Sequence, residues 1–324
     1  MTGASGYLGS NLVKKLSKNN NFNLVGLDIA HNKSITESIK FIKASLDNIS
    51  LLNKALDGID LICHCAGILN IDTNTNNQYF ETNVIGTQNI YREANKKNVK
   101  KIVLTSSIAS NSMNLFNYQW PVNEENESWP DDSYGISKKN QELIAQSYAD
   151  SELIQTIAIR PCAFFERSNP DIGFRLTGAH AMVDDIVNAH MAAINVLLDD
   201  SRSSKLKMFE AIFTTNKLPY KNDDKKLVNF NGDMKNLVKK YWPNESKFIF
   251  DLGYKKTLFP GVYDLSKAEK ILKWKPLFNF DEWMDSCKDR DLNFESEKEQ
   301  YRSKKSLKNR LKKIILKIRK YPTS

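Results

Sequence analysis

The sequence predicts an α/β fold built on a doubly wound parallel sheet, with helices on both faces of the sheet. Through the first half of the 324-residue chain, apolar strand-like runs alternate with segments of helical periodicity. A glycine-rich turn stands at the N-terminus, ahead of the first of these runs. The content of 41% hydrophobic and 26% charged residues is that of an ordinary globular protein. No run of about 18 apolar residues is present that could span a membrane.

The elements of the first half follow one another in a regular order. Apolar and β-branched runs predict strands over residues 22–28, 59–65, 101–106 and 154–160. Helical spacing of apolar residues predicts helices over residues 50–56, 78–97 and 134–149. Polar, Asn-rich or Pro-containing connections at residues 70–77 and 120–132 separate them. Each strand–helix–strand unit adds one parallel strand to the sheet.

The second half has a less regular pattern. A helix is predicted over residues 183–198, a strand over 208–213 and a short helix over 265–272. We therefore expect three parts: a first domain over residues 1–165, a substrate-binding region over 166–298 with segments that return to the first domain, and a tail over 299–324.

The tail holds the excess of positive charge. The whole chain has a net charge of +9, and 10 Lys and Arg but no Asp or Glu lie after residue 300, which leaves +9 minus 10, or −1, for the rest. Residues 303–320 place apolar side chains at helical spacing among the basic ones, which predicts a basic amphipathic helix. This helix either packs on the body or on a partner, or attaches the protein to an anionic membrane surface. Nucleic acid is not expected, because no aromatic residues interleave the basic ones.

The four cysteines do not have the spacing of metal ligands, so no metal site is predicted. Cys63 and Cys65 fall within an apolar strand-like run, whereas Cys162 and Cys287 stand alone. We interpret all four as buried, reduced thiols, with a disulfide or a metal role as the alternative. No secretory signal is recognised, and the expected location is the cytoplasm, with peripheral attachment to a membrane through the tail as an option.

The glycine-rich turn predicts a dinucleotide site. The turn reads Thr2-Gly3-Ala4-Ser5-Gly6-Tyr7-Leu8-Gly9, and the strand that follows it ends in Asp28, 19 residues past the last glycine. Glycines permit the tight turn, the close approach of backbone amides to a pyrophosphate, and the packing of the helix behind it. An acidic residue at the end of the second strand accepts hydrogen bonds from a ribose and repels a 2′-phosphate. The pattern therefore favours NAD over NADP, although Lys33 lies nearby.

A second motif predicts a base beside this cofactor. Tyr134 and Lys138 stand four residues apart in a predicted helix, so they lie on the same side of it. An ammonium group beside a phenol favours the phenolate, and we therefore expect a lowered pKa for Tyr134. Ser106 and Ser107 follow a predicted strand, at the carboxyl edge of the sheet where ligands bind. A serine hydroxyl there can hydrogen-bond the reacting oxygen.

In this order the motifs resemble those of the extended short-chain dehydrogenase/reductases, specifically the NAD-dependent epimerase/dehydratase family, which acts mostly on nucleotide sugars. The resemblance covers nearly the whole body. Besides the two motifs above, it includes His64-Cys65-Ala66-Gly67, the segment Asn83-Val84-Ile85-Gly86-Thr87-Gln88-Asn89, and Arg160-Pro161. Farther along, it includes Val183-Asp184-Asp185-Ile186, Tyr263-Asp264-Leu265-Ser266-Lys267-Ala268 and Leu272-Lys273-Trp274-Lys275-Pro276.

The resemblance implies a Rossmann-like fold and roles for particular residues. Tyr134 would be the general base, Lys138 would also hold the nicotinamide ribose, and Ser107, in preference to Ser106, would position the substrate hydroxyl. The implied reaction is hydride transfer between a sugar carbinol carbon and NAD. The residues expected to bind the cofactor are Gly3, Gly6, Tyr7, Leu8, Gly9, Asp28, Leu46, Ala66, Gly67, Asn83, Thr105, Tyr134, Lys138, Pro161 and Ala163. Relatives commonly form homodimers through helices such as 78–97 and 134–149. His64 is expected to have a structural role.

The sequence departs from the family pattern at several places. Relatives carry a hydrophobic strand directly before the Thr-Gly turn, whereas Met1 abuts Thr2 here, so we expect the first strand to be missing from this chain and to be supplied by an upstream extension. Ser45 stands where many relatives carry Asp, which predicts weaker adenine contacts. The segment after Ser107 lacks the acidic residues of sugar 4,6-dehydratases and sugar-acid decarboxylases, so neither reaction is expected.

The substrate clamp of relatives is shortened in this chain. Phe164 and Phe165 are followed by Glu166 and Arg167 and then by few residues before the Val-Asp-Asp segment, so Arg167 or Arg175 could meet a substrate phosphate or simply carry surface charge. Three functions remain open at this point. The chain is an oxidoreductase or epimerase of a nucleotide-linked sugar, a simple NAD(P)-dependent dehydrogenase or ketoreductase of a non-sugar substrate such as a lipid-like one, or a non-catalytic NAD-binding protein.

Overall fold

The computed structural model describes residues 1–36, 39–69, 76–112, 115–126, 128–165, 169–228, 233–251, 261–289 and 299. The amphipathic helix predicted over residues 303–320 lies outside the described residues, and so do Glu166 and Arg167. Among the described residues, no helix is long and apolar enough to cross a membrane.

The sheet consists of parallel strands in two hydrogen-bonded groups. One group pairs β1 (Val25–Asp28) with β2 (Lys40–Lys43), and the other has the order β3 (Ile62–His64), β4 (Lys101–Thr105), β5 (Gln155–Pro161), β6 (Phe209–Thr214). Helices connect the strands that follow one another along the chain, as a doubly wound fold requires. The predicted fold class is confirmed.

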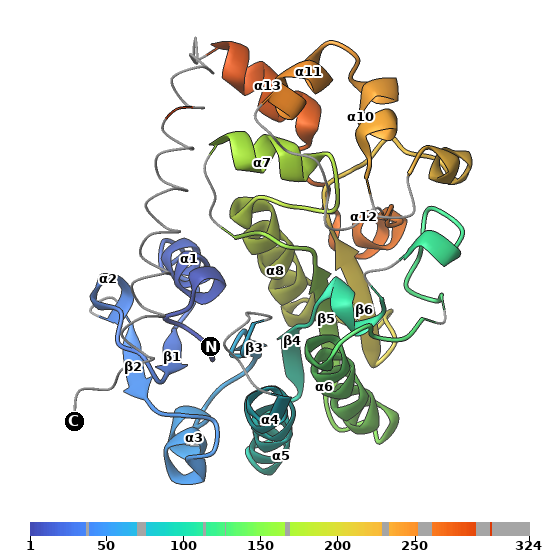
Figure 1. Ribbon diagram of the computed structural model, residues 1–324. Coiled ribbons are helices and arrows are strands. Elements are labelled where there is room, and N and C mark those ends of the chain that lie inside the picture. Colours follow the sequence, from blue (N-terminus) through green and yellow to red (C-terminus); the bar gives the residue numbers. More distant parts are fainter. Residues whose placement is uncertain are drawn as a thin grey trace, which may run out of the picture.

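Met1 and Thr2 lie between the two groups of strands and connect them. Thr2 forms parallel bridges with both Leu27 of β1 and His64 of β3. Its amide donates to Cys63 O at 3.1 Å, and its carbonyl accepts from Cys65 N at 3.2 Å. Figure 1 shows the N-terminus between β1 and β3. Two residues thus hold the position of the strand whose absence the sequence predicts, and they hydrogen-bond to Val25 and Leu27 of β1 and to Cys63 and Cys65 at the end of β3.

Helices cover both faces of the sheet, and the strand side chains alternate between them. One face packs on α1 (Tyr7–Leu16) and α8 (Val183–Leu198), with Cys63, Val103 and Ile157 pointing toward these helices. The other face packs on α3 (Ile49–Ala55), α5 (Gly86–Lys96) and α6 (Ser133–Asp150). Both faces of the sheet are therefore buried, which explains the continuous apolar runs in the sequence.

Most predicted elements are present with shifted ends. The long helix expected over residues 78–97 is a succession of α4 (Asn76–Tyr79), a π-helical segment η1 (Phe80–Ile85) and α5. The short helix predicted over residues 265–272 is α12 (Ser266–Leu272). β2 was not predicted from the sequence, because this four-residue edge strand begins and ends in lysine and buries little surface.

The second half adds short helices beyond the sheet. They are α7 (Asn169–Leu176), α9 (Asp200–Ser203), α10 (Lys235–Tyr241), α11 (Glu245–Asp251) and α13 (Phe280–Asp289), and Figure 1 shows α7, α10, α11 and α13 grouped together at the top of the view. Short turns of helix complete the chain at α2 (Lys33–Thr36), η2 (Ile108–Ser110), η3 (Leu115–Asn117) and η4 (Asn222–Leu227). Because β6 is a strand of the sheet and α8 packs on β4 and β5, these two segments of the second half lie with the first domain.

Candidate active site

The glycine-rich turn leaves no room for side chains at two of its glycines. Gly3 has φ +67°, and a Cβ there would lie 2.6 Å from Ala66 N. A Cβ on Gly9 would lie 2.0 Å from the carbonyl oxygen of Gly3, so the start of α1 packs directly on the turn. Gly6, at the N-cap of α1, carries no side chain that caps the helix. The turn therefore presents the N-terminus of a ten-residue helix as a cradle for an anion, which fits the diphosphate of a dinucleotide.

Asp28 ends β1 beside this turn. Its carboxylate accepts hydrogen bonds from the amides of Ser5 and Ala30, each at 2.9 Å. These bonds fix the carboxylate at the edge of the cleft next to the turn. An acidic group held there fits a ribose with two hydroxyls and disfavours a 2′-phosphate.

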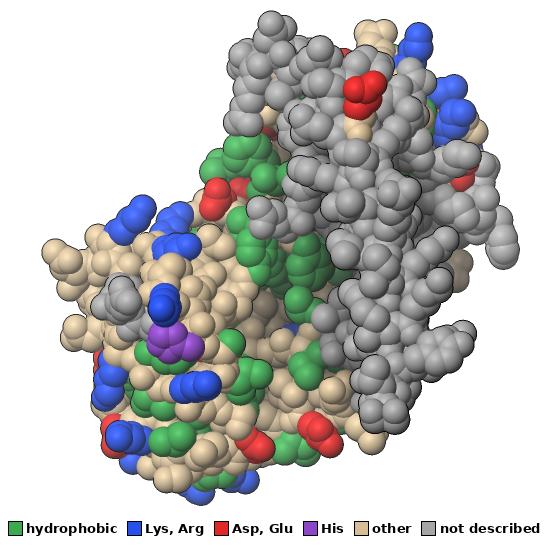
Figure 2. All heavy atoms as spheres, turned by 60° about the vertical axis from the view of Figure 1, so that its left-hand side comes forward, with side chains coloured by type: hydrophobic (Ala, Val, Ile, Leu, Met, Phe, Trp, Pro, Cys, Tyr) green, Lys and Arg blue, Asp and Glu red, His purple; other side chains and the backbone are tan. Residues whose placement is uncertain are grey.

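Two cavities flank the turn and share Gly3, Gly6, Cys65 and Gly67. The first, of about 640 Å³, is lined by Asp28, Leu46, Ala66 and their neighbours. The second, of about 330 Å³, lies over the ends of β4 and β5 and is lined by Tyr7, Leu8, Gly9, Thr105, Ser107, Tyr134, Lys138, Pro161 and Ala163. Figure 2 shows hydrophobic side chains gathered in the middle of the face that it draws. The two cavities thus meet along the glycine turn and the loop after β3.

Of the residues expected to bind cofactor, Asn83 lies behind the cleft rather than in its wall. Its side chain is fully buried. Oδ1 accepts from Ile68 N at 2.7 Å, and Nδ2 donates to Ile68 O at 3.1 Å and to Ser137 Oγ at 2.9 Å. A Cβ on Gly67 would approach Asn83 Oδ1 to 3.1 Å. Asn83 thus supports the loop after β3, which contacts the cavities through Ala66 and Gly67.

The three residues predicted to carry the chemistry come together in the 330 Å³ cavity. Ser107, after β4, hydrogen-bonds with Tyr134, at the start of α6. Lys138 lies one turn farther along α6, with its ammonium 5.9 Å from the centre of the Tyr134 ring and 3.0 Å from Thr105 O, to which it donates. Ser106 instead donates to Glu142 at 2.5 Å, so Ser107 is the serine beside the tyrosine.

The pKa of Tyr134 runs against the sequence prediction. Burial raises it to about 12, and the hydrogen bond with Ser107 opposes this only in part. Burial also lowers the pKa of Lys138 to about 8. The predicted lowering of the Tyr134 pKa by Lys138 was wrong because desolvation outweighs the charge of an ammonium that is directed at a backbone carbonyl.

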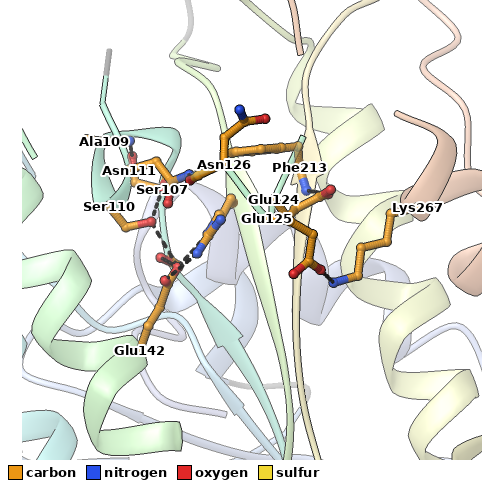
Figure 3. Close-up of polar contacts among 12 residues, drawn as sticks. Ser107, Ala109, Ser110, Asn111, Glu124, Glu125, Asn126, Glu142, Phe213 and Lys267 are labelled. Carbon is orange, nitrogen blue, oxygen red and sulfur yellow. Dashed lines mark hydrogen bonds and ion pairs between the residues drawn. The ribbon is translucent and has the colours of Figure 1, made fainter. Parts of the chain in front are cut away.

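A buried carboxylate supports the loop that carries Ser107. Glu142 on α6 accepts from Ser106 and Ser110 Oγ, the latter at 2.9 Å, and from Arg160 on β5 at 2.7 and 2.8 Å (Figure 3). Burial raises the pKa of Glu142, but the charge and hydrogen bonds of Arg160, aided by both serines, hold it below its ordinary value. The Ser107 hydroxyl accepts from Ala109 N at 3.1 Å. The ion pair joins α6 to β5, and Ser106 and Ser110 connect it to the loop after β4 that carries Ser107.

Aromatic rings and one arginine form the far wall of the 330 Å³ cavity. Phe164 stacks with Tyr7 and with Phe165, at centroid distances of 6.4 and 5.9 Å. Arg175 on α7 also lines this cavity, with Nε 3.5 Å from an oxygen of Asp171. Gly173 seats α7 against α13, since a Cβ there would lie 2.2 Å from the Trp283 ring. This short helix lies in the segment for which the sequence predicts a shortened substrate clamp.

Asp47 and Cys65 are among the cavity residues that were not predicted from the sequence. Asp47 accepts a hydrogen bond from Ser45 and brings a carboxylate to the 640 Å³ cavity. Cys65 was interpreted as buried, but it is partly exposed and lines both cavities. Its place at the carboxyl end of β3, next to Ala66, was the signal that could have identified it. Cys63, Cys162 and Cys287 are buried as predicted.

The fold and the glycine turn place the chain in the class of Rossmann-fold, dinucleotide-binding α/β proteins. The profile of the NAD dependent epimerase/dehydratase family matches residues 1–198, and the chain belongs to this family.

Individual relatives agree with this assignment. The chain is 26% identical over 165 residues to the UDP-glucose 4-epimerase of Vibrio cholerae, covering 50% of each chain. It is 30% identical over 172 residues to the N-acetyl-alpha-D-glucosaminyl-diphospho-ditrans,octacis-undecaprenol 4-epimerase of Escherichia coli O157:H7, covering 52% of this chain and 49% of that one. It thus spans about half the length of these curated relatives. The solved structure of UDP-glucuronic acid 4-epimerase from Bacillus cereus, with UDP-glucuronic acid and NAD, has a TM-score of 0.65 at 19% identity and covers 93% of this chain and 98% of that one, which supports the fold.

Proposed function

We propose that this protein binds NAD and oxidises, or epimerises, a hydroxyl-bearing carbon of a nucleotide-linked sugar. The observation that carries the proposal is the meeting of Ser107, Tyr134 and Lys138 in a cavity that continues into the glycine turn. A non-catalytic NAD-binding protein would not need a buried lysine beside a partly buried tyrosine, because the desolvation of both groups costs free energy.

The cofactor would lie along both cavities. The amides at the start of α1 would hold its diphosphate, and the Asp28 carboxylate would accept from the adenosine ribose hydroxyls. Lys138, beside Gly67, would donate to the nicotinamide ribose. The charge of Asp28 supports NAD over NADP.

Chemistry would take place around Tyr134. When bound, NAD⁺ accepts hydride from the carbinol carbon of the sugar. Ser107 would hold the reacting oxygen, and Tyr134 Oη would accept its proton as the carbonyl forms. With a pKa of about 12, Tyr134 needs additional positive charge nearby to act as a base at neutral pH. With a pKa of about 8, Lys138 keeps most of its charge at that pH and can supply it. In an epimerisation, the keto form of the sugar would turn its other face toward the cofactor site, and Tyr134 would then return the proton to the reacting oxygen.

The far wall supports a diphosphate-linked substrate. Arg175 supplies a cation for the diphosphate, and the stack of Tyr7, Phe164 and Phe165 offers planar apolar surfaces to a base.

The same wall also favours a second candidate, a lipid-linked sugar. Leu69, Ile108 and the two phenylalanines make the cavity wall largely apolar, and Leu69 is 40% exposed. The Escherichia coli relative is, by name, a 4-epimerase of a diphospho-undecaprenol-linked sugar. A polyprenyl diphosphate would use Arg175 in the same way and would need no base-binding surface.

One assay separates these candidates. Purified protein is incubated with NAD or NADP and a panel of UDP-, GDP- and dTDP-sugars, alongside a polyprenyl-diphosphate sugar in detergent. Products are resolved by chromatography while the absorbance of NADH is followed. An isomerised sugar without net NADH supports epimerisation, and accumulating NADH supports a dehydrogenase. Turnover of the polyprenyl substrate alone would select the second candidate, and turnover of none would refute both.

The assignment of Tyr134 has its own test. Tyr134→Phe removes only the hydroxyl, and turnover should fall by at least 10²-fold because the general base is lost. NAD affinity, followed by fluorescence quenching, should change little. Unchanged turnover would refute Tyr134 as the base. Tyr148→Phe, on the same helix, is the matched control.

We infer a homodimer through the outer face of η1 and α6. Phe80, Ile85, Ile136 and Leu143 are 40, 55, 42 and 54% exposed there. Light scattering should give twice the monomer mass, and Leu143→Glu should shift the protein to monomer. A monomeric wild-type protein would contradict this.

We also propose that the basic tail binds anionic membrane surfaces. The sequence pattern of residues 303–320 supports this. The whole chain should sediment with phosphatidylserine vesicles, and a chain ending at Gln300 should not. Equal sedimentation of the two would contradict the proposal.

A further inference from the structure

Two thiols lie together at the wall between the two cavities. Cys63 is in β3, and Cys65 is the first residue after this strand. Because the two residues are two positions apart, their side chains lie on the same side of the sheet, and their Sγ atoms are 3.6 Å apart. Cys63 is buried beneath the sheet, whereas Cys65 is partly exposed and lines both cavities. One thiol is thus accessible from the cleft and the second lies in contact behind it.

The surroundings of Cys65 favour its thiolate. Cys65 Sγ lies 3.3 Å from Thr105 Oγ1 as well as beside Cys63. The hydrogen bond from Cys63 lowers the pKa of Cys65 most, and burial opposes it; Thr105, the N-terminal ammonium and Lys138 lower it further. By contrast, burial raises the pKa of Cys162, whose Sγ faces a backbone carbonyl in the same region. Thiolate character, access and a neighbouring thiol are the properties of oxidant-sensitive cysteines.

We propose that Cys65 is a peroxide-sensitive thiol that the bound cofactor shields, and that Cys63 closes it into a disulfide. In the first step, the Cys65 thiolate attacks a peroxide oxygen. An S–O bond forms, the O–O bond breaks, the sulfur is oxidised to a sulfenic acid and hydrogen peroxide is reduced to hydroxide. In the second step, Cys63 sulfur attacks Cys65 sulfur. The S–S bond forms and the S–O bond breaks, and the departing hydroxyl leaves as water with the proton of the Cys63 thiol.

Oxidation would interfere with the cofactor site directly. Cys65 shares the wall of the cavities with Gly3, Gly6 and Gly67, and its amide donates to Thr2 O, which bridges β1 and β3. Drawing the two sulfurs together to a disulfide would move this backbone at the base of the glycine turn. The part of the proposal that concerns shielding rests on the proposed NAD site, whereas the reactivity of Cys65 does not.

The experiment uses the full-length reduced protein. Hydrogen peroxide is added with or without saturating NAD, remaining thiols are blocked with iodoacetamide, and peptide mass spectrometry follows each cysteine. We expect the peptide with Cys63 and Cys65 to lose two hydrogens, at least fivefold faster than Cys162 or Cys287 is oxidised, and NAD to slow this loss at least fivefold. The oxidised protein should bind NAD at least tenfold more weakly and recover with dithiothreitol.

Two variants assign the roles. Cys63→Ser should accumulate a sulfenic acid on Cys65, captured by dimedone, and Cys65→Ser should leave Cys63 reduced. Oxidation of Cys162 or Cys287 as fast as Cys65, in the wild-type protein, would overturn the proposal without any variant. If Cys65 is reactive but NAD does not slow its oxidation, the shielding is refuted and the proposed cofactor site is in doubt. If the wild-type protein turns over none of the sugars but Cys65 behaves as expected, only the proposed reaction is refuted.

Discussion

Two buried histidines beside the site remain neutral at physiological pH. His64 lies with Nδ1 2.6 Å from Thr2 Oγ1 and Nε2 2.9 Å from Thr87 Oγ1, and burial lowers its pKa to about 3. His190 on α8 contacts Ile186 O and Thr105 Oγ1 at 2.8 and 2.9 Å, and burial lowers its pKa to about 4. Both rings therefore connect elements of the fold as neutral groups, which supports the structural role predicted for His64.

These histidines should make the protein sensitive to mild acid. An unfolded histidine has a pKa near 6.5, so between pH 6.5 and about 4 the unfolded state binds more protons, and stability falls as the pH falls. Each histidine should contribute a loss of about 2 kcal/mol between pH 7 and 5. Urea unfolding at the two pH values measures this difference.

Variants separate the histidines from the carboxylates that titrate in the same range. His190→Gln should reduce the pH-dependent loss by about 2 kcal/mol, whatever its effect at pH 7. The same loss in His190→Gln as in the wild type would rule out the titration of His190 as its cause.

At the level of elements, the ion pair of Glu142 and Arg160 joins α6 to β5 and to the loop after β4. Both side chains are almost fully buried, at 4 and 5% exposure. Glu142→Gln keeps the shape but leaves the Arg160 charge without a counter-ion, so the free energy of unfolding should fall by about 3–5 kcal/mol. Because Ser106 and Ser110 flank Ser107, kcat should fall as well, with little change in NAD affinity.

A double variant distinguishes positioning from general stability. In Glu142→Leu with Arg160→Met no buried charge is left unpaired, so much of the stability should return. The serines still lose their acceptor, so kcat should remain low. Recovery of kcat together with stability would show that Glu142 acts through stability alone.

At the level of the whole molecule, Met1 and Thr2 bridge the two groups of strands. Below them lies a space of about 20 Å³ lined by Val25, Leu27, Ile62 and their apolar neighbours. The Met1 ammonium donates to Val25 O at 2.6 Å, and burial lowers its pKa. The middle of the sheet is therefore least filled at the amino ends of its strands.

A strand added before Met1 should stabilise the fold. A five-residue extension with the pattern Lys-Ile-x-Val-Thr would pair with β1 and β3 and fill this space, raising Tm by about 2–5 °C. Scanning calorimetry measures the shift, and a Gly-Ser extension of equal length controls for the removal of the ammonium. Equal Tm values for the two extensions would contradict the prediction that an added strand pairs with β1 and β3.

The sequence by itself determined the order of strands and helices, the glycine turn and the pairing of Tyr134 with Lys138. These features are local, since they depend on apolar periodicity and on spacing within one turn or helix. Elements that carry little local signal were missed, such as β2, and the tertiary contacts of α4, η1 and α5 altered the helix that periodicity predicts.

Only the tertiary structure decided the proton affinities and the walls of the cleft. Burial, which depends on packing from distant segments, raised the pKa of Tyr134 where local spacing predicted the opposite. The same packing brought Phe164, Arg175 and Cys65 into one cavity, although they come from different elements. Local sequence fixes which groups each segment carries, but long-range packing determines which of them lose water and which face the ligand, because desolvation and cavity shape are properties of the assembled fold.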